Sequence, residues 1–163
     1  QASNAKVSIL DGRCCFYALD NIVICVWLKP ATSVEMTEMA RFSDEVTQRW
    51  ERYSSVHVIE DNSGVPTKDG RDTLIARARA NKSRLACVAA LLPEGNIMAT
   101  LMRAFVRGVR TLTRGEIDIG IEQQPDALAT WLAPRHSQRT GVTVSGQAIE
   151  DLLVAARARA VGR

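Results

Sequence analysis

Residues 56–84 read VHVIEDNSGVPTKDGRDTLIARARANKSR, and this stretch decides the fold class. It begins with a short apolar run, 56–59, of the length of a strand. Turn-forming residues follow at 61–66, and a helix is predicted from about 69 to 84. The same alternation of strand and helix continues along the chain, which predicts an α/β fold of βαβ units: a mixed, mostly parallel sheet flanked by helices.

Three short β-prone runs precede this stretch. They cover residues 7–10, 15–19 and 22–28. Asp11-Gly12 and Asp20-Asn21 separate them, and these residues favour the tight turns of hairpins. The third run is apolar at every position through Trp27, which is typical of a central strand covered on both faces. The sequence therefore predicts an N-terminal β-hairpin of two or three strands.

The remaining elements are predicted from hydrophobic periodicity. Helices are expected over residues 33–53, 97–112, 125–132 and 145–160, and strands over 85–92 and 117–121. Ser33 is the expected N-cap of the first helix, although Met36 stands where a capping box has Glu or Gln. Asp118 and Gly120 favour an edge position for the last strand.

The domain organisation is expected to be simple. Residues 6–133 form the α/β domain, 134–144 a polar linker and 145–163 a C-terminal helix. This helix packs either on its own sheet or on a second copy of the chain, so a homodimer is an open alternative. Residues 1–5, QASNA, lack the apolar run of a signal peptide and are expected to be a remnant of an expression vector.

Composition excludes several classes of protein. The chain has 163 residues, of which 46% are hydrophobic and 24% charged, so it is long and apolar enough for its own core. It contains no apolar run near the roughly 20 residues of a membrane-spanning helix. The four cysteines form no CxxC pair, which argues against a zinc site, and a disulfide framework does not suit this length. We therefore expect a cytoplasmic protein without metal or other cofactor.

No catalytic signature is present, and we expect a protein that is not an enzyme. GxSxG, Walker A, GxGxxG after a strand and HExxH are all missing. His57 lies in a predicted strand, where a hydrogen-bonded structural role is favoured, and His136 lies in the predicted linker, where it is expected to be solvated. A deep closed pocket with His57 or Glu60 directed into it would favour a hydrolase instead.

The candidate site lies where the strand at 56–59 ends. Ligands and partners of open α/β sheets bind at the carboxyl ends of the strands. The predicted partner-binding residues are those of the turn and of the following helix start: Asp61, Asn62, Ser63, Asp69, Gly70 and Arg71. Amide groups at this helix start are also suited to an anion. The alternative is that residues 61–64 only form a turn and Asp69 only caps the helix.

The same stretch resembles a known family. Residues 58–66 (VIEDNSGVP), the Asp69-Gly70-Arg71 triplet and the helix after it are similar to the strand, acidic turn, second Asp and helix of sulfate-transporter and anti-sigma-factor-antagonist (STAS) domains. Residues 127–132 (ALATWL) resemble the end of the related SpoIIAA-like proteins. The resemblance spans roughly residues 16–132. It implies a STAS-like fold and a regulatory module that binds a protein partner or a small ligand.

The chain departs from the family at one important position. In the phosphorylated antagonists a Ser follows the second Asp, whereas Gly70 stands there in this chain. Glycine has no hydroxyl group, so the phosphorylation switch is not carried over. Ser63, Thr67 and Thr73 lie nearby but match no position of the family.

A basic helix face suggests a second function. Arginines recur at spacings of four, three and four residues, which places them on one helix face: Arg103, Arg107, Arg110 and Arg114. Such a face is suited to an acidic partner, an anionic lipid surface or nucleic acid. The alternative is a solvated helix face, because no aromatic residues for base stacking are interleaved with the arginines.

Overall fold

The computed structural model describes residues 4–61, 63–94 and 97–162, which form six strands and five helices. In chain order these are β1 (Lys6–Leu10), β2 (Cys14–Leu19), β3 (Ile22–Trp27), α1 (Ser33–Thr47), β4 (Tyr53–Ile59), α2 (Lys68–Ala80), β5 (Leu85–Leu91), α3 (Ile97–Leu112), β6 (Asp118–Glu122), α4 (Pro125–Thr140) and α5 (Gly146–Ala160). The α/β fold class predicted from the alternation is confirmed.

All six strands form one sheet in the order β1-β2-β3-β4-β5-β6. The β1–β2 and β2–β3 pairs are antiparallel, and the three pairs from β3 to β6 are parallel. The two hairpin turns contain Gly12 at φ 70° and Asp20 at φ 51°, values that the predicted turn residues tolerate. The mixed, mostly parallel sheet with an N-terminal hairpin is therefore confirmed, and β6 lies at an edge as expected.

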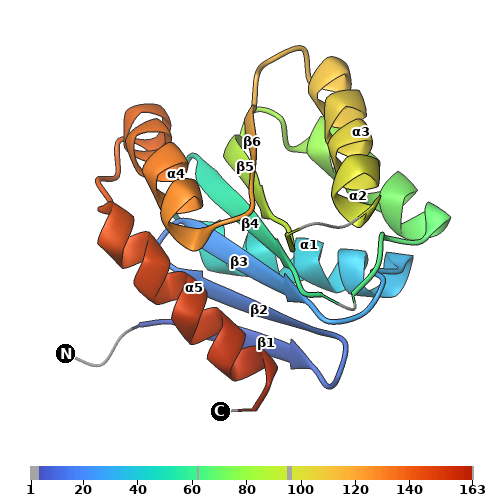
Figure 1. Cartoon of the computed structure of the whole chain (residues 1–163). Helices are drawn as coiled ribbons and strands as arrows, with labels where there is room; N and C mark the ends of the chain where they lie inside the picture. The colour runs from blue at the N-terminus through green and yellow to red at the C-terminus, as the bar shows by residue number, and fades with distance from the viewer. Residues whose placement is uncertain (1–3, 62, 95–96, 163) are drawn as a thin grey trace.

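The order of the strands decides which helices cover which face. Because β3 to β6 are adjacent in sequence and in space, right-handed crossovers place α1, α2 and α3 on the same face of the sheet. The other face would be exposed to water without further elements. Helices α4 and α5 cover it, so the sheet lies between two helical layers (Figure 1). Residues of β3 are buried on both faces, as the sequence predicts.

Helix α5 packs on the sheet of its own chain. Ile149, Leu153 and Ala156 are buried together with β2 and β3 residues such as Ile24. Figure 1 shows the helix lying across these strands. The intrachain alternative for this helix is the one observed.

Three predicted boundaries are wrong. Helix α1 ends at Thr47 and not near residue 53, because Tyr53 begins β4 and is buried in the sheet. Its N-cap is Thr32 rather than Ser33, and Glu35 three residues later completes a capping box. Helix α2 ends at Ala80, four residues before the predicted end at 84.

The predicted polar linker is also wrong over most of its length. Residues 134–140 continue α4 even though Pro134 lies inside the helix. The continuation buries His136 completely, and it allows Arg139 to pair with Asp118 of β6 at 2.7 Å. These tertiary contacts outweigh the local cost of proline in a helix interior. The helix ends at Gly141, which has the left-handed φ of 74° that is typical of such an end.

Candidate functional site

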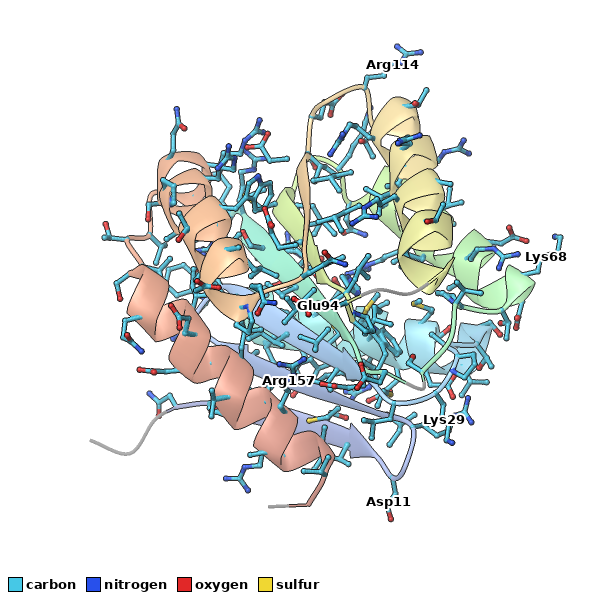
Figure 2. The ribbon with its side chains drawn as sticks, viewed as in Figure 1. Asp11, Lys29, Lys68, Glu94, Arg114 and Arg157 are labelled. Atoms are coloured by element: carbon cyan, nitrogen blue, oxygen red, sulfur yellow. The ribbon has the colours of Figure 1, made fainter. Side chains whose placement is uncertain are left out.

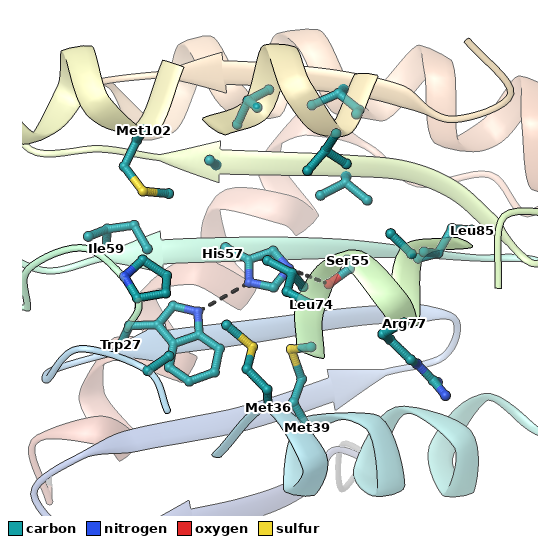
Figure 3. Close-up of a pocket in the computed structure, with 18 of the residues that line it drawn as sticks. Trp27, Met36, Met39, Ser55, His57, Ile59, Leu74, Arg77, Leu85 and Met102 are labelled. Atoms are coloured by element: carbon teal, nitrogen blue, oxygen red, sulfur yellow. Dashed lines mark hydrogen bonds between the residues drawn. The ribbon is translucent and has the colours of Figure 1, made fainter. Parts of the chain in front are cut away.

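An apolar cavity lies between the sheet and helices α1, α2 and α3, with a volume of about 90 Å³. Its floor is formed by every second residue of β4, namely Tyr53, Ser55, His57 and Ile59, because alternate side chains of a strand point to the same face. Side chains from β3 and all three helices complete the lining, among them Trp27, Met36, Met39, Leu74 and Met102 (Figure 3). A cavity of about 90 Å³ is smaller than the pockets of roughly 300–1,000 Å³ that hold drug-sized ligands, so it has room only for a very small apolar molecule.

The hydrogen bonds of His57 fix its tautomer. The indole Nε1 of Trp27 donates to His57 Nδ1 at 3.1 Å, and an indole nitrogen can only donate. The proton of the neutral ring is therefore on Nε2, which donates to Ser55 Oγ at 3.1 Å. Burial lowers the pKa of His57 to about 4, so the ring is neutral at pH 7. His57 is directed into a pocket, but it has no free nitrogen that could take a proton from Ser55.

A second serine–histidine pair lies on the other face of the sheet. His136 was expected to be solvated, and this is wrong: it is completely buried. Asn21 Nδ2 donates to the Arg52 carbonyl at 3.0 Å, so its Oδ1 accepts from His136 Nε2 at 3.1 Å. His136 Nδ1 then accepts from Ser54 Oγ at 2.7 Å. Ser54 thus donates to His136, and His136 donates to Asn21. A catalytic nucleophile, its base and the group that orients the base are hydrogen-bonded in the same order.

This second group is closed to a substrate. Ser54 and His136 have no exposed surface, and Asn21 is 1% exposed. None of the three lines the cavity under α1, α2 and α3. The Ser54–His136–Asn21 group joins β4 to α4 and the β2–β3 turn. Its hydrogen bonds give buried polar atoms the partners without which their burial would destabilise the fold. Neither serine–histidine pair combines an accessible serine with a basic nitrogen.

Two of the predicted partner-binding residues, Ser63 and Asp69, form hydrogen bonds to the segment around the start of α1. Ser63 is buried and its Oγ donates to the Lys29 carbonyl at 3.2 Å. The Asp69 carboxylate accepts from the Ser33 amide at 3.2 Å. Arg71 Nη1 donates to the carbonyl of Pro66 at 2.7 Å. Asp61 is exposed, and Asn62 lies outside the described residues.

The start of α2 is packed tightly against the loop before α1. A Cβ on Gly70 would lie 2.2 Å from the carbonyl oxygen of Ala31, so the backbone approaches as closely as only glycine allows. Hydrogen bonds from Thr67 and from Ser33 lower the pKa of Asp69 to about 2. Position 70, which the resemblance to STAS domains matches to a phosphate-accepting Ser, is thus closed to any side chain in this arrangement.

The arginines predicted on the face of α3 are all exposed: Arg103, Arg107, Arg110 and Arg114. Arg110 also donates from Nη2 to the Ile119 carbonyl at 2.6 Å. Figure 2 shows Arg114 beyond the end of α3, directed away from the sheet. All four predicted arginines are therefore exposed, and one of them is tied to β6 by a hydrogen bond.

One end of the cavity carries residues that the sequence analysis missed. Arg77 of α2 lines the cavity and forms two hydrogen bonds to the Asp44 carboxylate of α1, at 3.0 and 2.5 Å. Arg84 lies 3.7 Å from the same carboxylate and stands over the Tyr53 ring at 5.4 Å. The sequence shows these two arginines but not their pairing with Asp44, because that pairing depends on how α1 and α2 pack.

Metal ligands and cysteine thiols are the other groups that could carry chemistry. No three His, Cys, Asp or Glu side chains gather there as metal ligands. All four cysteines are buried and form no disulfide, and burial raises the pKa of Cys14 to about 12. Within residues 4–61, 63–94 and 97–162, no helix is long and apolar enough to cross a membrane.

Comparison with known proteins gives no relative. No family model, no curated protein and no solved structure matches the chain. The resemblance to STAS domains therefore stays a prediction, and the α/β architecture is the established part of the fold.

Proposed function

We propose that the chain is a non-catalytic regulatory module of STAS-like type that binds a small apolar ligand in the cavity. The observation that carries this proposal is the cavity itself: apolar side chains from the sheet and three helices surround a few polar groups. The arrangement of the two serine–histidine pairs supports a role without catalysis. His57 donates to Ser55, and the Ser54–His136–Asn21 group is sealed inside the fold.

The cavity reaches the loop that carries the proposed partner-binding residues. Ser63, Gly64 and Pro66 line one end of it. The same loop contains the exposed Asp61 and leads to Asp69 at the start of α2. A ligand that moves this loop would change the surface offered to a protein partner. Occupancy of the cavity is in this way coupled to partner binding in the proposed module.

The proposal predicts that filling the cavity abolishes ligand binding. Ala90 of β5 lines the cavity, so Ala90→Leu adds volume inside it. We expect the parent chain to bind xenon, an apolar probe small enough for the cavity, and Ala90→Leu to bind it at least about tenfold more weakly, measured by a xenon titration followed through methyl NMR shifts. The reason is that the added side chain occupies space that the probe needs.

Ala104→Leu is the matched control, because Ala104 is exposed on α3 and does not line the cavity. Its affinity for xenon should equal that of the parent chain. Thermal unfolding of both variants checks that they fold. Absence of xenon binding by the folded parent chain, or equal binding by Ala90→Leu, would contradict the proposed function.

A further inference from the structure

The positive charge of the chain is concentrated in α3 and the turn after it. Residues 97–115 contain four arginines and no acidic residue. The whole chain has a formal net charge of +3, so all the other residues together carry one negative charge in excess. The four residues form the arginine face: Arg103, Arg107, Arg110 and Arg114. A surface with such an excess of one sign attracts a partner of the opposite sign.

The rest of the fold leaves the charges of the arginine face unbalanced. All four arginines are exposed, and none of them belongs to an ion pair among the described residues. The acidic residues that follow in the chain pair with other cations. Glu116 lies 3.3 Å from Lys82, and Asp118 lies 2.7 Å from Arg139. The arginine face therefore offers its positive charge to a partner outside the chain.

The arginine face is a row along the outer side of α3. Arg103, Arg107 and Arg110 stand at positions i, i+4 and i+7, which share one side of a helix and span about 10 Å of its axis. Arg114 continues beyond the end of the helix (Figure 2). The other exposed residues of α3 that the structure describes are small: Thr100, Ala104, Gly108 and Thr111. They leave the guanidinium groups accessible to a large partner.

A nucleic-acid duplex offers the matching pattern of negative charge. Each strand carries one phosphate per about 3.4 Å of axis, so a row of cations about 10 Å long lies beside about three phosphates. Guanidinium groups bind phosphate oxygens through paired hydrogen bonds, which ammonium groups do not form. Arginine rather than lysine stands at all four positions.

Other anionic partners fit α3 less well. Helices that bind membrane surfaces insert apolar side chains among the lipids. The large apolar side chains that are exposed among the described residues all lie outside α3. Single strands are bound through aromatic side chains on which the bases stack, and no described residue exposed on α3 is aromatic. Both observations favour a duplex that is contacted through its backbone.

We propose that the arginine face binds the phosphate backbone of a nucleic-acid duplex without reading its base sequence. This is a second function, separate from the cavity. It uses the outer side of α3, whereas Met102 and Val106 on the inner side are buried and line the cavity.

Fluorescence anisotropy with a labelled DNA duplex of arbitrary sequence tests the proposal. We expect the full chain to bind the duplex, with a slope of about −3.6 in the logarithm of the binding constant against the logarithm of the salt concentration, because four phosphates are neutralised. The double substitution Arg103→Gln and Arg107→Gln should weaken binding at least about tenfold at low salt and bring the slope to about −1.8.

The matched control is the double substitution Lys6→Gln and Arg159→Gln. Both residues are exposed, lie on β1 and α5, and belong to no ion pair among the described residues. The control removes the same charge and should keep the salt slope of the parent chain. Thermal unfolding checks that both variants fold.

Three results with the duplex would overturn the proposal: no binding by the folded parent chain, an unchanged affinity of the α3 variant, or an equal loss of affinity in the control. Two further probes test the class of partner, namely a single strand of the same length and vesicles of phosphatidylcholine and phosphatidylserine in equal parts. Equal or tighter binding to either probe would overturn the assignment of a duplex.

Discussion

At position 70 the backbone of α2 meets the Ala31 carbonyl so closely that only a hydrogen atom fits between them. We predict that Gly70→Ser, which would supply the hydroxyl group found in STAS antagonists, destabilises the chain by about 1–3 kcal/mol. The added Cβ forces the start of α2 away from the loop before α1. Urea unfolding of the parent chain and the variant measures the difference in the free energy of unfolding.

Gly108→Ser is the control for this substitution. Gly108 is exposed in α3, and no heavy atom lies within 4 Å of a Cβ built there. The control should be as stable as the parent chain or slightly more stable, since serine has a higher helix propensity than glycine. A Gly70→Ser variant with undiminished stability would show that the close approach to Ala31 is wrong.

Among the elements, α5 shows how a covering helix is held in place. Leu153 is 1% exposed on the sheet side of α5, whereas its neighbour Val154 is 69% exposed. We predict that Leu153→Ala lowers the free energy of unfolding by about 2–5 kcal/mol, because it leaves a cavity between α5 and the sheet. Val154→Ala should change it by less than about 0.5 kcal/mol. Thermal or urea unfolding compares the two variants.

The solution mass of the chain provides a separate check on α5. If the helix packed on a second copy, removal of residues 141–163 would convert a folded dimer into a folded monomer. Packing within the chain predicts instead that this truncation removes the cooperative unfolding transition, because the apolar face of β2 and β3 becomes exposed. Size-exclusion chromatography with light scattering distinguishes the two results.

On the scale of the whole molecule, the two helical layers each bury one histidine. Burial lowers the pKa of His57 on one face and of His136 on the other to about 4, from an ordinary value of 6.5. Between these pH values the unfolded chain binds protons that the folded chain does not. We therefore predict that stability falls on acidification from pH 7 to pH 5, by about 1.4 kcal/mol per pH unit for each histidine once the pH is below 6.5.

Urea midpoints at pH 7, 6 and 5 measure this dependence. His57→Gln removes one of the two protonation sites, so its stability should change less steeply with pH than that of the parent chain, even if it is lower at pH 7. A parent stability that is constant over this range would contradict the neutral, buried state of both histidines.

The local pattern of apolar, polar and turn residues was enough to predict most of the strands and helices. Alternation of strand and helix gave the mixed, mostly parallel sheet, and the uninterrupted apolar run of β3 gave a strand covered on both faces. Turn residues such as Gly12 and Asp20 located the hairpins. The boundaries were less predictable: α1 was extended into β4, because Tyr53 continued the apolar spacing of the helix.

The candidate site was decided by contacts between distant parts of the chain. Residues 61–71 were identified from the sequence as a loop and helix start, but two of their polar side chains bind the segment around the start of α1. The bond between His136 and Asn21 joins residues 115 positions apart, and the cavity needs side chains from three helices and the sheet. By itself, then, the sequence determined the secondary structure and the class of the sheet, since both depend on spacing between neighbouring residues. Only the tertiary structure decided which helices cover which face, where the cavity lies and that Arg77 borders it, because these depend on packing between segments that the sequence keeps far apart.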